Sequence, residues 1–505
     1  MRTMQYFAYV LDHKLAIAAS AFVLFIFYRI YTYLTHPLRS FPGPFFCRLT
    51  NLPYSTWFFS GRRDFYILSL HERYGPVIRI APNELSFNTA NSWKDIYGFR
   101  PDHRPFIKSE FYEGAASYDN KVSGVGTVRD PAKHAKMRKY LSYGFSAKAL
   151  AEQEVLVVEN VELLIRQMRE RGVRDGEVMD SEHWLRMATL DIMGDLAFGK
   201  SFDALKNGGQ HPSVRFMHEA IRQMKVIDTM RRFPYAGKLF ALFFARTLYK
   251  LLQGNRMHEQ FSLQTVRDRL ANPDPRPDIL THLQHSYDPD LPFASDIQLA
   301  AYAAEFLHAG ADTSSTTINT VLNFVLRSPS LYMRLTTEIR TAFLTYASIN
   351  NQQASKLPLL RSVILEAMRI YPPTPLGLPR LVPEGGDSVD GFWIVGGVTV
   401  STNAVAASLS PKNFPDPYTF KPERWDKEGK EKGMDILNAS NPFSLGARGC
   451  LGQNLAWMEM NLIICMIFWS FDLELVNTEM DLHRDSKMDS LWEKPPLFVR
   501  ITERQ

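Results

Sequence analysis

The feature that most constrains the fold of this 505-residue chain is a glycine-rich segment near its C-terminus. It reads Phe-Ser-Leu-Gly-Ala-Arg-Gly-Cys-Leu-Gly from Phe443 to Gly452, so that glycines flank Cys450 on both sides. A helical pattern follows from Asn454 to Phe468, which places the cysteine near a helix N-terminus. There the helix dipole and the unpaired N–H groups favour a thiolate over a thiol. The segment therefore predicts a positioned, reactive sulfur.

The other cysteines call for a different interpretation. The chain has three, Cys47, Cys450 and Cys465, so it has no disulfide framework and at least one thiol is unpaired. Cys465 lies in an apolar helical run, where cysteine behaves as a small hydrophobic residue. We expect Cys47 and Cys465 to serve packing, and Cys450 to be a ligand or a nucleophile.

The residues around Cys450 suit a haem. Glycines such as Gly446 allow the backbone to approach a flat ligand and to aim N–H groups at the sulfur. Arg448 supplies a cation for a carboxylate, and Phe443 would shield the thiolate from water. The segment resembles the haem-ligand signature of the cytochrome P-450 family, Phe-x-x-Gly-x-Arg-x-Cys-x-Gly, and matches every fixed position. The resemblance implies haem b as cofactor, with Cys450 as the axial ligand of its iron.

A second segment is similar to the distal helix of this family. Ala309-Gly310-Ala-Asp312-Thr313 interrupts a long helical pattern whose start at Ser295 is a plausible N-cap. The resemblance implies that Ala309 and Gly310 leave room for a diatomic ligand. Thr313 would hydrogen-bond dioxygen, and Asp312 would help to relay protons toward it. By itself, a threonine at such a position commonly bonds back to its own helix.

Cations for the haem propionates are expected at three further positions. His134 and Arg138 are four residues apart on one helix face, and Arg380 follows a proline-rich segment. The resemblance assigns all three, with Arg448, to propionate binding. Most members have tryptophan where this chain has His134, but histidine can still donate to a carboxylate. The alternative for His134 is a solvated helix residue.

Three charged residues are expected to be structural. Glu366 and Arg369 are three residues apart on one helix, and Arg424 follows in Lys-Pro-Glu-Arg-Trp. As an isolated pattern this is an ordinary surface ion pair. The family resemblance makes these residues a buried network that holds the core beside the haem.

The N-terminus predicts a membrane anchor. Leu15 to Leu34 is apolar apart from Arg29, and twenty helical residues span roughly 30 Å, the thickness of a bilayer core. A cleaved signal peptide and a buried core helix are the alternatives. We expect an anchor and hinge over residues 1–40 and a catalytic domain over 41–505. The basic residues after the apolar run favour a position of that domain in the cytosol. The resemblance to microsomal members implies a single-pass protein of the endoplasmic reticulum membrane.

The pattern of the remaining chain indicates a mainly α fold with minor β structure. Strand-like segments at 77–80 and 84–87 precede a long helical region from about 131 to 370. Two more, at 392–395 and 398–400, flank a pair of glycines. The resemblance covers roughly residues 41–500 and implies the cytochrome P-450 fold, preceded by one transmembrane helix.

The resemblance implies a monooxygenase that oxidises a small apolar molecule with O2. Electrons would come from NADPH through cytochrome P-450 reductase, with cytochrome b5 as a further candidate donor. Basic residues on the helix of His134 would suit an acidic donor, although a lysine-rich surface helix is equally ordinary. A net charge of only +5, from 58 basic and 53 acidic residues, argues against nucleic acid as a partner.

Two other functions remain open. One keeps the haem but isomerises or dehydrates an oxygenated substrate without external electrons. The other is a haem-binding sensor or membrane-bound scaffold without turnover. The Asp312-Thr313 pair favours the monooxygenase over both.

Substrate specificity is expected in Phe111 to Val128, in residues 202–245 and in Leu376 to Leu378. Individual residues that could face a substrate are Phe233, Phe243, Leu376 and Leu378, and packing in the core is the alternative that we favour for them. Gly385-Gly386 and the segment from Ser410 to Pro417 look most like fungal microsomal members that act in secondary metabolism.

Overall fold

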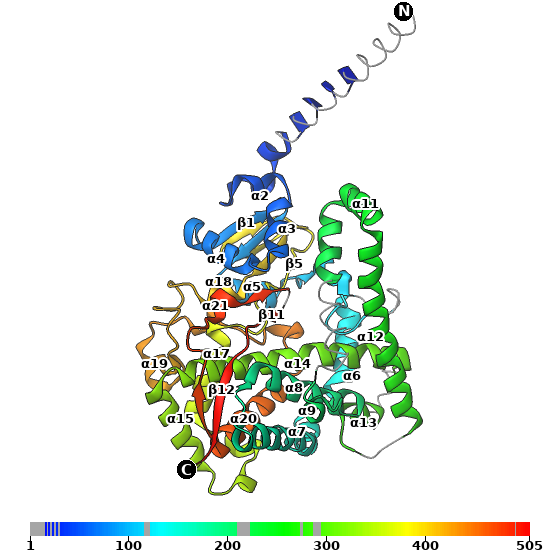
Figure 1. Cartoon of the computed structure of the whole chain (residues 1–505). Coiled ribbons are helices and arrows are strands. Elements are labelled where there is room, and N and C mark those ends of the chain that lie inside the picture. Colours follow the sequence, from blue (N-terminus) through cyan, green and yellow to red (C-terminus); the bar gives the residue numbers. More distant parts are fainter. Residues whose placement is uncertain are drawn as a thin grey trace, which may run out of the picture.

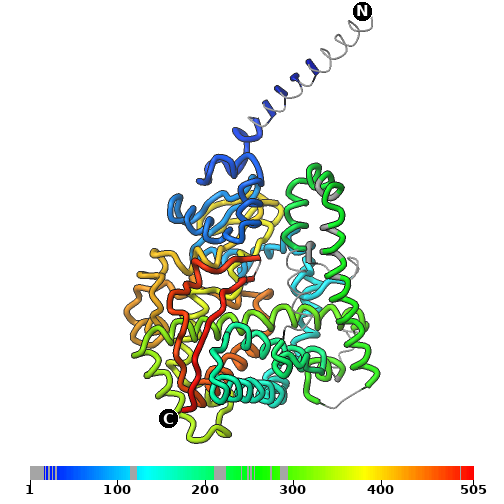
Figure 2. Tube along the Cα trace, in the orientation of Figure 1, coloured from blue at the N-terminus to red at the C-terminus, as the bar shows by residue number. Residues whose placement is uncertain are grey.

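The computed structural model describes residues 31–504, except 116–121, 210–222, 273–275, 286–293 and 490, together with isolated residues between 16 and 28. The body is mostly helical, with small sheets at one side (Figures 1 and 2). The mainly α prediction is therefore confirmed.

The helices and strands have the following bounds. The α-helices are α2 (Phe45–Leu49), α3 (Leu52–Phe59), α4 (Arg63–Tyr74), α5 (Ala90–Tyr97), α6 (Pro131–Ser142), α7 (Ala147–Gln167), α8 (Ser181–Phe198), α9 (Ala204–Asn207), α11 (Pro234–Phe243), α12 (Ala245–Ala271), α13 (Ile279–His285), α14 (Asp296–Leu326), α15 (Pro329–Ala342), α16 (Asn351–Ala354), α17 (Pro358–Ile370), α18 (Ala404–Ser408), α19 (Lys427–Lys432), α20 (Gln453–Ser470) and α21 (Leu482–Asp485). The strands are β1 (Val77–Ala81), β2 (Glu84–Phe87), β3 (Ile107–Lys108), β4 (Met179–Asp180), β5 (Arg380–Leu381), β6 (Asp387–Val389), β7 (Phe392–Ile394), β8 (Thr399–Thr402), β9 (Phe471–Leu475), β10 (Lys487–Met488), β11 (Trp492–Glu493) and β12 (Phe498–Glu503).

Helix α14 is the central element of the helical body. Ser295 caps it as predicted, because its side chain accepts a hydrogen bond from the N–H of Gln298 at 3.2 Å. The helix packs against α8, α12, α17 and α20, and most of its residues are buried (Figure 1). Apolar residues of these helices form the main hydrophobic core, which fixes the position of the Ala309–Thr313 segment.

Helix α20 begins three residues after Cys450 and is apolar on nearly all sides. An α-helix of this composition must be buried all round. Cys465 in this helix is fully buried, and so is Cys47 in α2, as expected of packing residues.

A five-stranded sheet of order β1-β2-β8-β5-β3 lies beside the helices. In it Arg380 pairs directly with Lys108, so the two side chains lie on the same face. The segments on either side of Gly396-Gly397 are strands, as predicted, but they join different sheets: β7 pairs with β6, whereas β8 lies between β2 and β5.

The predicted network of Glu366, Arg369 and Arg424 is present and buried. Both carboxylate oxygens of Glu366 accept hydrogen bonds from Arg369 at 2.8 Å, and Arg424 Nε lies 3.4 Å from Glu366 Oε1. Arg369 also donates to the carbonyl oxygens of Ser408 and Pro417. The network therefore joins α17 to the chain segments that lead toward the cysteine loop.

In the part of the chain that the structure describes, no helix has the length and apolar character needed to cross a bilayer. Much of the segment from Leu15 to Leu34 lies outside those residues. The N-terminal anchor therefore stays a prediction.

Candidate active site

The cysteine loop is a compact turn closed by its own backbone. The N–H of Cys450 donates to the carbonyl oxygen of Phe443 at 2.8 Å, and the N–H of Gly449 donates to Gly446 at 3.0 Å. Ser444 and Gly446 both have left-handed backbone conformations, with φ of 56° and 68°. The turn thus fixes the sulfur just before the start of α20.

Gly446 is required for a reason that the sequence did not reveal. A Cβ at this position would lie 2.2 Å from the carbonyl oxygen of Tyr97, the last residue of α5. Gly446 therefore permits a close approach to protein backbone, and the expected approach of the loop to a flat ligand stays a prediction. Phe443 packs its ring against Trp457 of α20, with 6.3 Å between the ring centroids, and its expected shielding of the thiolate stays a prediction.

The sulfur of Cys450 is exposed, unlike those of Cys47 and Cys465. Burial nevertheless raises the pKa of the Cys450 thiol, opposed by the N–H of Gly452 and the charge of Arg138. Together these facts place Cys450 at an accessible position that is nevertheless surrounded by much of the protein. The helix end alone does not favour the thiolate, contrary to our expectation; a coordinated metal ion would deprotonate such a thiol.

The predicted propionate-binding residues come together from separate segments. Burial, together with the charges of Arg448, Lys108, Arg138 and Arg380, lowers the pKa of His134 to about 3. His134 is therefore a buried neutral imidazole, and the alternative of a solvated helix residue is wrong. A charge acts at this strength only within a few ångströms in a poorly hydrated site.

Two of these cations, Arg138 and Arg448, also hold the cysteine loop in place. Arg138 of α6 donates to the carbonyl oxygen of Gly449 at 2.6 Å. Arg448 donates to the carbonyl oxygens of Val128 and Arg129 at 2.7 and 2.8 Å. Arg380 donates to the hydroxyl of Tyr112 at 3.0 Å.

Lys108 belongs to this cluster and was missed by sequence reasoning. Its ammonium donates to the carbonyl oxygens of Val125, at 3.3 Å, and Gly126. Burial and the charges of Arg380 and Arg448 lower the pKa of Lys108 to about 7, partly offset by Glu305. No local pattern marks this lysine; only the pairing of β3 with β5 brings it beside Arg380.

This cluster of cations fits the carboxylates of a haem. Burial and Arg380 lower the pKa of Arg448 to about 10, with Tyr112 and Asp130 only partly compensating. Like charges gathered in a buried site raise the free energy of the folded chain unless anions join them. Two propionates beside Arg448, Arg380 and Lys108 would supply that compensation.

On the distal side, Ala309 is exposed although the neighbouring residues Leu307 and Ala311 are fully buried. Thr313 donates its hydroxyl to the carbonyl oxygen of Ala309 at 2.7 Å, the back-bonding that threonine commonly shows. This turn of α14 therefore exposes the small side chain of Ala309, whose carbonyl oxygen accepts the hydrogen bond from Thr313.

Asp312 does not join Thr313, although the two are adjacent in sequence. Its carboxylate is buried and accepts a hydrogen bond from Lys494 at 2.8 Å, on another side of α14. The two side chains point in different directions because successive helical residues lie about 100° apart, and the expected role of Asp312 in relaying protons stays a prediction.

The expected substrate-facing residues are only partly described. Residues 116–121 and 210–222 of the predicted walls lie outside the described residues. Leu376 is buried beside Phe111 in a small apolar cluster. Phe243, at the end of α11, is 76% exposed, so it is neither a core residue nor a pocket wall here.

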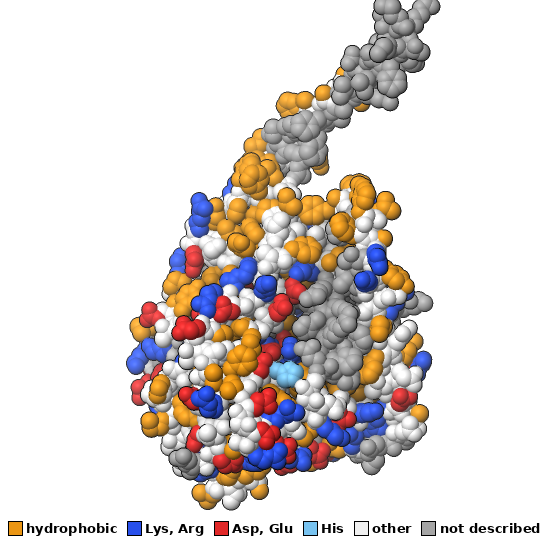
Figure 3. All heavy atoms as spheres, in the orientation of Figure 1, with side chains coloured by type: hydrophobic (Ala, Val, Ile, Leu, Met, Phe, Trp, Pro, Cys, Tyr) orange, Lys and Arg blue, Asp and Glu red, His pale blue; other side chains and the backbone are white. Residues whose placement is uncertain are grey.

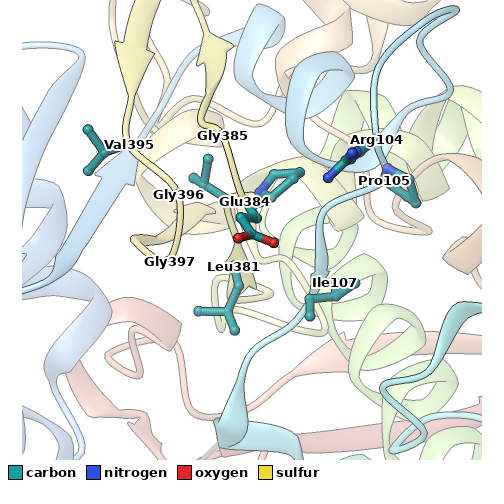
Figure 4. Close-up of a pocket in the computed structure, with 11 residues that line it drawn as sticks. Arg104, Pro105, Ile107, Leu381, Glu384, Gly385, Val395, Gly396 and Gly397 are labelled. Carbon is teal, nitrogen blue, oxygen red and sulfur yellow. The ribbon is translucent and has the colours of Figure 1, made fainter.

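A groove of about 760 Å³ lies on the outer side of the β3–β5 pair (Figure 4). It is lined by Ile107 and Leu381, whose neighbours Lys108 and Arg380 point to the opposite face because side chains alternate along a strand. The groove is therefore separate from the cation cluster and from the cysteine loop.

A positioned cysteine, a cluster of cations and a distal helix with a small residue and a threonine define a haem-thiolate site. The family model for Cytochrome P450 matches residues 40–501. The chain belongs to the cytochrome P450 family. It is accordingly an oxidoreductase of the monooxygenase type, with a thiolate-ligated haem iron as cofactor.

Relatives and a solved structure agree with this assignment. The chain is 43% identical to Cytochrome P450 monooxygenase ORF11 of Penicillium roqueforti (strain FM164), over 90% of this chain and 93% of that protein. It is 37% identical to Cytochrome P450 monooxygenase BipB of Cochliobolus sativus, over 95% of each. The crystal structure of a cytochrome P450, CYP102L1, has the same fold, with a TM-score of 0.73 at 20% identity over 88% of this chain and 94% of that one.

Glu459 of α20 leads to a prediction about pH. It is buried, Ser314 of α14 donates to it at 2.5 Å, and burial raises the pKa of its carboxyl to about 8. Because the folded protein keeps this proton between about pH 4.5 and 8, its stability falls as pH rises through that window. Glu459→Gln removes this loss, so the unfolding free energy of the variant relative to wild type should rise by about 1 kcal/mol per pH unit there. Denaturant unfolding from pH 5 to 8.5 checks this, and a constant difference would contradict it.

Proposed function

We propose that this chain is a membrane-anchored monooxygenase that oxidises a small apolar molecule, with Cys450 as the axial ligand of the haem iron. The observation that carries the proposal is Cys450, an exposed residue in a loop that its own backbone hydrogen bonds close. Bound there, the haem would supply dioxygen activation, promoted by electron donation from the thiolate.

Nine other residues have roles in this proposal, and seven of them lie around the cysteine and the propionate-binding cations. Phe443 shields the sulfur, and Gly446 allows the loop to pack on α5. The propionates are held by residues from four segments, namely Arg448, His134, Arg138, Arg380 and Lys108. His134, being neutral and buried, would act as a hydrogen-bond donor and not as a cation.

Thr313 and Asp312 are proposed to deliver protons on the distal side. The Thr313 hydroxyl already lies on the exposed turn of α14 and can exchange its bond to Ala309 for a bond to a reactant. Asp312 would have to leave Lys494 to reach that turn.

The exposed apolar residues support association with a membrane. Several lie on α2, α3 and α11: Phe45, Phe46, Leu52, Phe59, Leu242 and Phe243. In Figure 3 orange side chains gather at the end of the body from which residues 31–35 lead away. An exposed patch of this kind favours contact with lipid. We therefore propose an anchor and hinge over residues 1–40 in the endoplasmic reticulum membrane, with the catalytic domain, 41–505, in the cytosol.

The electron donor is proposed to be an NADPH-dependent cytochrome P450 reductase, with cytochrome b5 as a second candidate. Lys133, Lys136 and Lys139 of α6 are exposed, while His134 of the same helix is buried beside the cations of the site. A basic helix this close to the haem suits an acidic donor protein. Because the relatives are fungal monooxygenases, we place the reaction in a fungal secondary-metabolite pathway.

Thr313→Ala tests the proposed reaction. We first select a substrate by type I spectral shifts with a panel of aromatic polyketides, terpenes and indole alkaloids. The variant should bind it unchanged but convert a several-fold smaller share of the NADPH consumed into product, because a proton donor is lost. The measurement is product formed per NADPH, with reductase. Full coupling in the variant would refute the role of Thr313, and product without reductase would favour an isomerase or dehydratase.

A further inference from the structure

Lys494 is a buried lysine that joins the C-terminal segment to α14. It lies between β11 and β12, and its side chain is 1% exposed. Its ammonium donates to Asp312 Oδ1 at 2.8 Å and to the hydroxyl of Thr316 at 2.7 Å. Asp312 is thus held on the side of α14 away from the exposed Ala309 turn.

The same ammonium has a second carboxylate within reach. Glu182 Oε1 of α8 lies 3.5 Å from Lys494 Nζ, and its other oxygen lies 3.4 Å from Arg186. Both carboxylate side chains are only 7% exposed. A buried lysine without any partner strongly destabilises the folded protein. Lys494 would avoid this if Asp312 turned away, because Glu182 would still be within reach of its ammonium.

We propose that Lys494 is a positioning residue for proton delivery, which holds Asp312 as a carboxylate away from Thr313. When Asp312 turns toward Thr313, Glu182 becomes the carboxylate partner of the Lys494 ammonium. This rests on the proposed function. Asp312 has two positions in this proposal, one paired with Lys494 and one turned toward Thr313. Because Glu182 can pair with Lys494 in either case, the free-energy difference between these positions is smaller than it would be if Asp312 were the single carboxylate partner of Lys494. The lysine itself stays in place.

The other groups facing Asp312 are consistent with this role. Thr316, one turn along α14, accepts a bond from Lys494 and donates to the carbonyl oxygen of Asp312. Tyr371, after α17, lies near enough for Asp312 and Glu182 to raise its pKa, and burial raises it more, so it stays a neutral phenol. Arg186 balances the charge of Glu182.

A first experiment needs no turnover and uses the haem-containing full chain. Lys494→Met leaves the Asp312 carboxylate buried beside Glu182 without its cation, so folding should favour a protonated Asp312. The unfolding midpoint of this variant should fall relative to wild type as pH rises from 5.5 to 8.5. Adding Asp312→Asn should remove most of that pH-dependent fall, and Lys494→Arg should restore the wild-type profile. A pH-independent difference would overturn the proposal.

A second experiment measures where electrons go in the absence of substrate. With reductase and NADPH, dioxygen becomes hydrogen peroxide with two electrons and two protons, or two waters with four of each. Glu182→Gln keeps the Asp312–Lys494 pair but removes the second carboxylate, so Asp312 is held more firmly. We expect a several-fold higher ratio of peroxide to water, and a larger solvent deuterium isotope effect on NADPH oxidation than in wild type.

The two experiments separate the inference from the proposed function. An unchanged peroxide ratio and isotope effect in Glu182→Gln would overturn the role of Glu182. If wild type oxidises no NADPH with reductase, the proposed electron supply fails. The unfolding experiment then still decides whether Lys494 holds Asp312 as a carboxylate.

Discussion

Replacing Arg369 with methionine is expected to leave no folded, haem-binding protein. The side chain is fully buried and binds both oxygens of Glu366 and the carbonyl oxygens of Ser408 and Pro417. Breaking a buried ion pair costs about 3–5 kcal/mol, and each buried polar group left without a partner adds about 1–3 kcal/mol. The sum is comparable to the 5–15 kcal/mol that stabilises a typical folded protein.

The measurement is the amount of soluble protein with bound haem after expression. Arg500→Met is the matched control, because Arg500 pairs with Glu474 at 2.7 Å on the surface, with both side chains more than half exposed. That pair should contribute about 0–1 kcal/mol, so the control should resemble wild type. Similar haem content in the two variants would contradict a structural role for the buried network.

Gly446→Ala is expected to have the second large effect, a loss of stable haem binding. Its φ of 68° is strained for alanine, and the new Cβ would lie 2.2 Å from the carbonyl oxygen of Tyr97. Neither the loop nor α5 can move without displacing Cys450 or the end of that helix. The haem content of purified protein should fall several-fold, since the sulfur loses its fixed position.

Gly433→Ala is the control that separates the effect of backbone strain from the effect of the steric contact with Tyr97. Gly433 has nearly the same φ, 64°, but nothing lies within 4 Å of its added Cβ. It should cost only about 1–2 kcal/mol and keep its haem. Equal haem loss in both variants would show that backbone strain, and not the contact with Tyr97, makes Gly446 necessary.

Local sequence patterns were enough to predict the cysteine loop, the start of α14 and the Glu366–Arg369 pair. Each of these depends on residues close together in the chain, such as a cap at Ser295 or charges three apart on a helix. Arg424 could be added because the family resemblance supplied the long-range contact. The strand segments were also predictable, but not which sheet β7 and β8 would join.

The missed residues depend on contacts between distant segments. Lys108 lies beside Arg380 only because β3 pairs with β5, and Lys494 reaches Asp312 across 182 positions. Asp312 and Thr313 are adjacent in sequence, but their side chains have different partners because neighbours on a helix face different directions. The pKa of Cys450 is likewise set by burial, which sequence does not reveal.

The most direct test of the central claim is the reduced carbon-monoxide difference spectrum of the wild type beside Cys450→Ala and Cys465→Ala. If the Cys450 thiolate is the haem ligand, wild type and Cys465→Ala, which alters only a buried packing residue, should show the red-shifted Soret band of thiolate ligation. Cys450→Ala should lack that band. An unchanged thiolate band in Cys450→Ala would contradict the assignment of Cys450 as the ligand.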